Sequence, residues 1–362
     1  MEIDNKTAQY FSNVKQVFLY LSDKCNLLCE QCLYKPNVVY EKEIAFETAK
    51  ELLYTFKQLG AFKLTVLGGE VSLYDHENNS AKLILLLEYA RAIGYQYIRI
   101  DTNGQRRVFF QNNAVFRNID EVSFSIDGYN SETNDCLRGR GTFSRAIESL
   151  KLLQNSNRNL SINITTCVTK QNVRIAGGIE NFLNHMIAYA TEIGISQLNF
   201  HGVFKMGVPM DAWTGDSHLN PIEWYYETQN IAQNVKAGNY HIDVRFPVHI
   251  VKRDEFNKHP KYYGYCPCKL GERALIHPDG IIRVCSSMLS TPYGVAHYND
   301  NQITWNSFNN EIVKHEINEY TPCTNQTELY TGDFCPICFS IKPYQREIIW
   351  DTSHVEMLRS NE

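Results

Sequence analysis

The feature that most constrains this chain is a run of three cysteines near its beginning, Cys25, Cys29 and Cys32. The chain holds 11 cysteines in 362 residues, and nine of them gather in two groups, one at 25–32 and one between 266 and 338. The opening residues are polar and acidic and lack the apolar core of a secretory signal, which favours a cytoplasmic location. In a reducing compartment, clustered cysteines indicate metal ligands or catalytic thiols rather than disulfides.

The spacing of the first group, Cys-x3-Cys-x2-Cys, directly follows an apolar run at 17–21. Such a loop can wrap one face of an iron–sulfur cubane, which four cysteines normally hold. No fourth cysteine lies nearby, so one iron would keep an open position, as a catalytic zinc does for its substrate. The alternative is a structural zinc site, although zinc sites usually pair one Cys-x2-Cys with a second, distant ligand pair.

Short apolar runs alternate with helical patterns over the first 204 residues. This order predicts right-handed βαβ units and a parallel sheet. Six such units are too few for a closed eight-fold barrel, so we expect an α/β fold with a partial (β/α)6 barrel and a small C-terminal cysteine-rich domain. The expected strands are 17–21, 62–67, 97–100, 122–126, 162–168 and 197–204.

The expected domain boundaries follow from this pattern. Residues 1–15 form an N-terminal extension, 16–237 the partial barrel, 238–345 the cysteine-rich domain and 346–362 a tail. Glycine and polar residues follow the expected strands at 68–70, 102–104 and 127–128. Because barrels carry their chemistry at the C-terminal ends of strands, these residues and the first cysteine group should share one face.

The segments CNLLCEQC and LGGE together resemble the radical S-adenosylmethionine (SAM) superfamily. The resemblance implies an enzyme in which Cys25, Cys29 and Cys32 bind a [4Fe–4S] cluster whose fourth iron binds SAM. It also implies that the Gly-Gly-Glu segment contacts the SAM amino group. Arg138 would pair with the SAM carboxylate, for which a guanidinium fork is suited. The SAM-binding residues implied in this way are Gly68, Gly69, Glu70, Asn103, Ser123, Ser125, Arg138 and Val168.

One position departs from the family pattern. The family usually places an aromatic residue just before the third cysteine, near the adenine, and this chain has Gln31 there. Tyr34 is the candidate to compensate for it.

The second cysteine group resembles the SPASM and twitch domains, which hold auxiliary clusters. Cys268-x11-Gly280-x4-Cys285 matches their opening, and Cys335-x2-Cys338 supplies a later pair. The resemblance implies one auxiliary [4Fe–4S] cluster on these four cysteines. Cys266 could replace Cys268, and Cys323 could serve a second, incomplete cluster. A zinc-stabilised tail is the alternative for the same residues.

The activity implied is reductive cleavage of SAM to a 5′-deoxyadenosyl radical, which removes a hydrogen atom from a substrate C–H bond. We expect an oxidoreductase that modifies a peptide, with a sugar, aminocyclitol or other small natural-product intermediate as the alternative substrate. A non-enzymatic cysteine-rich metal-binding protein is the alternative of another class. A general base would assist proton loss, and its candidates are Asp127, His201 and Lys205.

The expected partners are the substrate and an electron donor such as flavodoxin or ferredoxin. A formal net charge of −5 gives no basic footprint for nucleic acid. No apolar stretch reaches the length of a membrane span, so no membrane partner is expected.

Overall fold

The computed structural model describes residues 1–34, 38–156, 159–204, 217–258, 270–286, 294–299, 301–306 and 334–338. The chain forms two compact units that interleave along the sequence. The first comprises residues 1–125, 144–162 and 267–320, and the second comprises 126–143, 163–266 and 321–362. The predicted domain boundaries at 15, 237 and 345 stay predictions. None of the helices in the described ranges combines the length and the apolar character that crossing a membrane requires.

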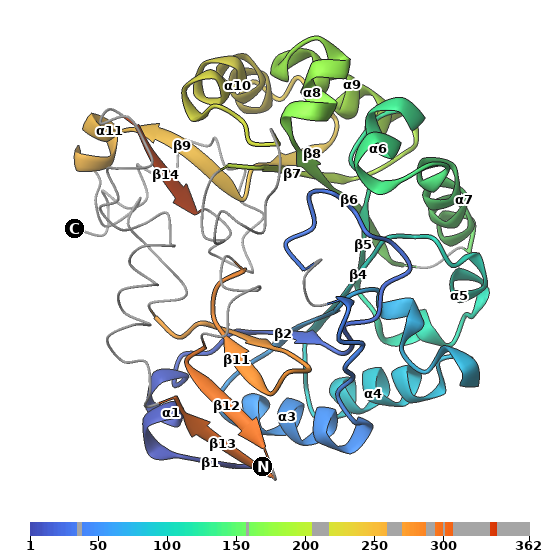
Figure 1. Ribbon diagram of the computed structural model, residues 1–362, viewed down its shortest axis with the longest axis vertical. Helices are drawn as coiled ribbons and strands as arrows, with labels where there is room; N and C mark the ends of the chain where they lie inside the picture. The colour runs from blue at the N-terminus through green and yellow to red at the C-terminus, as the bar shows by residue number, and fades with distance from the viewer. Residues whose placement is uncertain are drawn as a thin grey trace. The chain divides into compact units, whose positions relative to one another are not determined.

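The first unit is built on a sheet whose strands run in the order β1-β13-β12-β11-β10-β2-β3-β4-β5 (Figure 1). Strands β10, β2, β3, β4 and β5 are parallel neighbours, whereas β10 to β13 form an antiparallel meander. The strands are β1 (Glu2–Ile3), β2 (Gln16–Tyr20), β3 (Lys63–Leu67), β4 (Tyr97–Thr102), β5 (Glu121–Ser125), β10 (Arg273–Ile276), β11 (Ile281–Arg283), β12 (Ala296–Asn299) and β13 (Gln302–Trp305).

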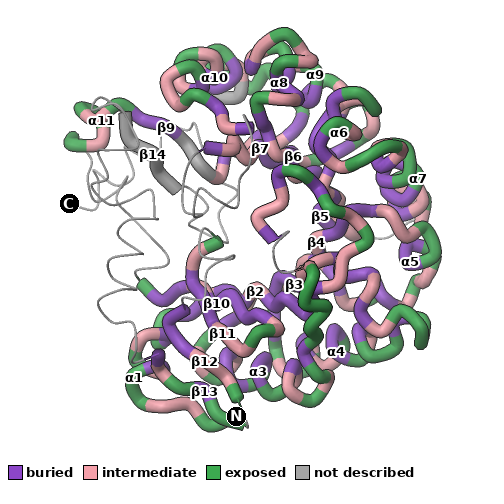
Figure 2. Tube along the Cα trace, viewed as in Figure 1, coloured by how far each residue is buried: buried purple, intermediate pink, exposed green. Residues whose placement is uncertain are grey.

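The parallel strands are covered by helices with one apolar face. In α3 (Phe46–Gln58) the buried residues Ala49, Leu52, Leu53 and Phe56 recur at helical spacing. The centre of β3 is buried as well, and so is all of β2 except Phe18, which is half-buried (Figure 2). The other helical elements of this unit are α1 (Asn5–Tyr10), η1 (Val71–Leu73), η2 (His76–Asn78), α4 (Ala81–Ala92), α5 (Arg107–Gln111), η3 (Val115–Asn118) and most of α7 (Thr142–Gln154).

The second unit contains most of β6 and the strands that follow it. Strand β6 (Ser161–Val168) pairs in parallel with β7 (Gln197–Gly202), and β7 pairs with β8 (Asp243–Arg245). Strands β9 (Val248–Lys252) and β14 (Phe334–Cys338) form a separate antiparallel pair. The helices are α6 (Ser131–Arg138), α8 (Lys170–Ala176), α9 (Ile179–Glu192), α10 (Pro221–Lys236) and α11 (Arg253–Lys258).

The predicted fold class is confirmed. The six expected strands are present as β2 to β7, with ends that differ from the prediction by one or two residues at most positions. The turn at 278–280 joins β10 to β11 in an antiparallel hairpin, and Gly280 has the positive φ of 87° that this turn needs. The hairpin joins the sheet beside β2, because β10 pairs in parallel with that strand.

Candidate functional site

The cysteine loop begins against the glycine-rich segment that follows β3. The backbone N–H of Gly69 donates to the carbonyl of Ser22 at 2.7 Å, and that of Glu70 donates to the carbonyl of Lys24 at 2.8 Å. A Cβ on Gly69 would overlap the carbonyl oxygens of Asp23 and Lys24. The second glycine is therefore required for the chain to approach this closely just before Cys25.

The Glu70 carboxylate is nearly fully buried and accepts three hydrogen bonds from the protein. Its Oε1 accepts from Thr102 Oγ1 at 2.7 Å and from the backbone of Ser72 at 3.0 Å, and its Oε2 accepts from the backbone of Asn103 at 2.7 Å. Glu70 thereby ties the end of β3 to the end of β4. Its predicted contact with the SAM amino group stays a prediction.

Asn103 extends this connection to the first cysteine. Its Nδ2 donates to Asn26 Oδ1 at 2.8 Å and lies 3.8 Å from Cys25 Sγ, which also accepts from the backbone of Leu27 at 3.4 Å. Burial, followed by the charges of Glu70 and the other two cysteines, raises the pKa of the Cys25 thiol to about 12. A thiolate here requires a cation or cluster to stabilise it, and N–H donors aimed at the sulfur suit such a ligand.

The third cysteine lies beside a buried group of rings that the sequence analysis missed. Cys32 packs against Tyr20, Tyr34 and Leu275. The ring of His277 stacks on Tyr20 with centroids 4.1 Å apart, and the Tyr34 hydroxyl donates to Asp23. Residues from the start of the chain and from the β10–β11 hairpin meet here because β10 lies next to β2.

The other predicted SAM contacts in the first unit are Gly68, Ser123 and Ser125. Gly68 adopts φ 153°, and a Cβ on it would overlap the backbone carbonyl oxygen of Ser22. Ser123 is buried within β5, and Ser125 is half-buried at the end of that strand. The SAM contacts predicted for Gly68, Ser123 and Ser125 stay predictions.

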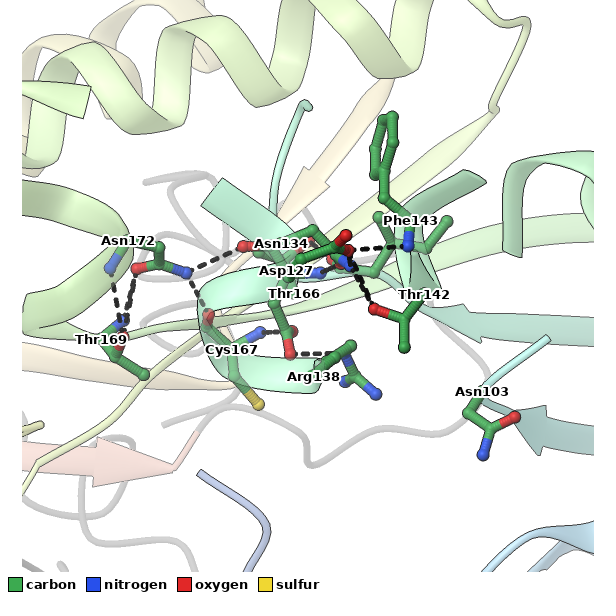
Figure 3. Close-up of polar contacts among 12 residues, drawn as sticks. Asn103, Asp127, Asn134, Arg138, Thr142, Phe143, Thr166, Cys167, Thr169 and Asn172 are labelled. Carbon is green, nitrogen blue, oxygen red and sulfur yellow. Dashed lines mark hydrogen bonds and ion pairs between the residues drawn. The ribbon is translucent and has the colours of Figure 1, made fainter. Parts of the chain in front are cut away.

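The second unit contains a buried ion pair that joins two predicted site residues. Arg138 Nε lies 2.6 Å from Asp127 Oδ2, and Asp127 Oδ1 accepts from the backbone of Cys167 at 2.6 Å (Figure 3). The Asp127 carboxylate is fully buried, and the Arg138 side chain is 10% exposed. Both carboxylate oxygens of Asp127 are thus engaged within the protein, and its predicted role as a general base stays a prediction.

The remaining predicted residues of this unit lie at strand ends. Val168 ends β6 and is fully buried. His201 is half-buried near the end of β7. Lys205 lies outside the described residues. The roles predicted for these three residues stay predictions.

The predicted auxiliary ligands are described only in part. Cys285 lies in the first unit, two residues beyond β11, and is half-buried. Cys335 and Cys338 lie on β14, where they pair along the backbone with Val251 and Val248 of β9. The other candidates, Cys266, Cys268 and Cys323, fall outside the described residues.

The donor set of the first unit fits an iron–sulfur cluster that binds SAM. Among the residues that the structure describes, no three His, Cys, Asp or Glu side chains converge closely enough to hold a single metal ion. A cubane does not need such convergence, because each thiolate binds a different iron. The loop supplies three thiols with a buried amide donor beside one of them.

Comparisons with known proteins agree with this geometry. The family model described as the Radical SAM superfamily matches residues 19–175. The mycofactocin maturase MftC of Mycolicibacterium smegmatis is 27% identical over 184 residues, which is 50% of this chain and 44% of that protein. A GTP 3′,8-cyclase of Petrotoga mobilis is 25% identical over 49% of this chain and 53% of its own. The chain thus spans about half the length of these curated relatives.

A solved structure shares the fold. The structure of native anSMEcpe with bound AdoMet and the Cp18Cys peptide superposes with a TM-score of 0.57 at 18% identity. The superposition covers 78% of this chain and 77% of that one.

Proposed function

Because residues 19–175 match the Radical SAM superfamily, we propose that this chain belongs to that superfamily, cleaves SAM reductively and removes a hydrogen atom from a C–H bond of a peptide substrate. The observation that carries the proposal is the contact between the cysteine loop and the Gly-Gly-Glu segment, which Glu70 and Asn103 extend to the end of β4. The groups that we assign to the cofactor lie at the C-terminal ends of β2, β3 and β4, the edge at which such sheets bind ligands, and this supports the proposal.

In this proposal Cys25, Cys29 and Cys32 hold the [4Fe–4S] cluster, and Asn103 donates toward the Cys25 sulfur. The cluster with SAM supplies a 5′-deoxyadenosyl radical, and the protein orients it and excludes water. Gly68, Gly69 and Glu70 line the approach for the SAM amino group. Arg138 offers a guanidinium to the SAM carboxylate.

The auxiliary [4Fe–4S] cluster is the second cofactor that we propose, on Cys268, Cys285, Cys335 and Cys338. Cys266 and Cys323 are further candidate ligands. A cluster of this kind can accept the electron that remains on the substrate after hydrogen removal. The first cluster would be reduced by a donor such as flavodoxin or ferredoxin, and a cytoplasmic location would suit these oxygen-sensitive groups.

A peptide is the substrate we favour, because the solved structure with the same fold was obtained with a bound peptide and MftC is a maturase by name. A small molecule is the second candidate, and the similarity to a GTP 3′,8-cyclase favours it. The two are distinguished by incubating the reduced enzyme and SAM with candidate peptides or with GTP and following product mass.

The test of SAM cleavage uses protein reconstituted with iron and sulfide under anaerobic conditions. With dithionite and SAM it should release 5′-deoxyadenosine, and Cys29→Ala should release none. Cys136→Ala is the matched control, because Cys136 is exposed and lies on α6, outside the ligand groups. A reconstituted protein that forms no 5′-deoxyadenosine, or a Cys29→Ala variant that still forms it, would refute the proposal.

A further inference from the structure

Two strands of the second unit bring a thiol and an imidazole together near their C-terminal ends. Strands β6 and β7 are parallel, and their register makes Cys167 of β6 the direct neighbour of His201 of β7. Paired strands lie about 4.8 Å apart, so side chains at paired positions reach each other when they point to the same face. The C-terminal ends of strands are where sheets of this kind carry their chemistry.

Cys167 and His201 lie on the same face of the sheet. The opposite face consists of fully buried residues from alternate positions of the two strands, namely Ile164, Thr166, Val168, Leu198 and Phe200. One pair earlier in the register, Asn199 Nδ2 donates to Thr165 Oγ1 at 3.4 Å, so side chains of the two strands meet on the face of Cys167 and His201. Both Cys167 and His201 are half-buried on this face.

The backbone of Cys167 is fixed on both sides. Its N–H donates to Asp127 Oδ1 at 2.6 Å, and its carbonyl accepts from Asn172 Nδ2 at 2.9 Å. The sulfur points away from these hydrogen bonds (Figure 3). The backbone therefore holds the thiol at one place on the half-buried face.

The charged groups around Cys167 are balanced, so the imidazole is the neighbour that can change the protonation of the thiol. The ion pairs of the adjoining elements are Asp127 with Arg138 and Asp243 with Arg245. The basic side chains of α8 are exposed, namely Lys170 and Arg174. A thiol beside a histidine can pass its proton to the imidazole, which lowers the pKa of the thiol from about 8.5 to about 3.5–7.5.

A carbon electrophile suits this site better than a metal ion, because no third ligand converges on the pair among the residues that the structure describes. We propose that Cys167 and His201 form a nucleophilic pair for a carbon–carbon double bond conjugated to a carbonyl. His201 accepts the thiol proton, the sulfur bonds to the β-carbon, and the imidazolium returns the proton to the α-carbon. The addition needs no oxidant or reductant. It goes beyond the proposed function, because it requires neither SAM nor an iron–sulfur cluster.

The experiment uses acrylamide as the probe, because it is a small amide with a conjugated double bond. The anaerobically reconstituted holoenzyme is treated over a range of pH without SAM, and the adduct at each cysteine is quantified by peptide mass spectrometry. The rate at Cys167 should have its midpoint below about pH 7.5. At about pH 6.5 Cys167 should react about 3-fold or more faster than the exposed Cys136, whose thiol donates to the Thr133 carbonyl at 3.3 Å.

His201→Gln should raise the Cys167 midpoint by about one pH unit or more, because the imidazole no longer accepts the proton. Thr165→Val is the matched control, because it removes only the hydroxyl that accepts from Asn199 on the same face. Its midpoint should equal that of the wild type.

A wild-type midpoint above about pH 7.5, or no adduct at Cys167, overturns the inference whether or not the variants fold. An unchanged midpoint in His201→Gln overturns it as well, and so does an equal shift in Thr165→Val. Release of 5′-deoxyadenosine has no part in this assay, so the proposed function stands or falls separately.

Discussion

Glu70 offers the sharpest test of how the site is built, because its carboxylate is already engaged by three protein donors. The change is Glu70→Gln, which preserves shape and removes the charge. The best orientation of the amide keeps the oxygen toward Thr102 and Ser72 and turns the NH2 group toward the backbone N–H of Asn103. One accepting oxygen is then replaced by a donor that faces another donor.

The magnitude follows from those contacts. A hydrogen bond to a charged group is worth about 1.5–3 kcal/mol, and a stranded buried donor costs about 1–3 kcal/mol. We expect Glu70→Gln to lower the free energy of unfolding by about 2–3 kcal/mol. Thr102→Val removes a single donor to the same carboxylate and should cost about 1.5–3 kcal/mol.

The assay is urea unfolding of the cluster-free protein, in which bound cofactors cannot contribute. The variant that combines Glu70→Gln with Thr102→Val should lose less free energy of unfolding than the sum of the two single losses, because both changes affect the bond between Thr102 and Glu70. If Glu70→Gln unfolds within about 0.5 kcal/mol of the wild type, the three hydrogen bonds to the carboxylate do not stabilise the fold and the reasoning is refuted.

Three further changes test other parts of the structure. Gly69→Ala should lower the free energy of unfolding by more than about 3 kcal/mol and reduce the iron bound on reconstitution, because the added Cβ overlaps backbone oxygens. Gly238 has open space around it and φ 72°, so Gly238→Ala should lower the free energy of unfolding by only about 1 kcal/mol. Equal losses in the two variants would contradict this reasoning. Burial, and then the charge of Arg283, lower the pKa of His277 well below its usual range. The folded protein keeps this ring neutral, whereas the ring in the unfolded chain takes up a proton below about pH 6.5. The free energy of unfolding is therefore unaffected by this histidine above that pH and falls by up to about 1.4 kcal/mol per pH unit below it. His277→Phe should flatten this acid dependence of urea unfolding, and an unchanged slope would contradict the assignment. Replacing both Cys335 and Cys338 with alanine should spare SAM cleavage and lower bound iron by about one cubane, and an unchanged iron content would argue against the auxiliary cluster.

Local patterns were sufficient to predict the main elements of the fold. Strands β2 to β7 follow from short apolar runs that alternate with helical patterns. The positions of Gly68, Gly69, Glu70 and Asn103 after strands could be predicted because parallel strands present their C-terminal ends together.

The contacts between distant segments could not be predicted in this way. Pairing of β10 with β2 places Leu275 opposite Phe18, and no local pattern encodes that register. The stack of His277 on Tyr20 beside Cys32 depends on it, so His277 escaped notice. Likewise, the sequence marks Asp127 and Arg138 as polar residues near strand and helix ends, but their ion pair depends on how α6 packs.

The central claim is that three cysteines leave one iron open for SAM. The direct measurement is electron paramagnetic resonance of the reduced protein, with both Cys335 and Cys338 replaced so that the first cluster alone contributes. Addition of SAM should shift the cluster spectrum, and a carboxylate labelled with ¹⁷O should show hyperfine coupling to the iron. A spectrum that SAM leaves unchanged, or zinc in place of iron on Cys25, Cys29 and Cys32, would contradict the account.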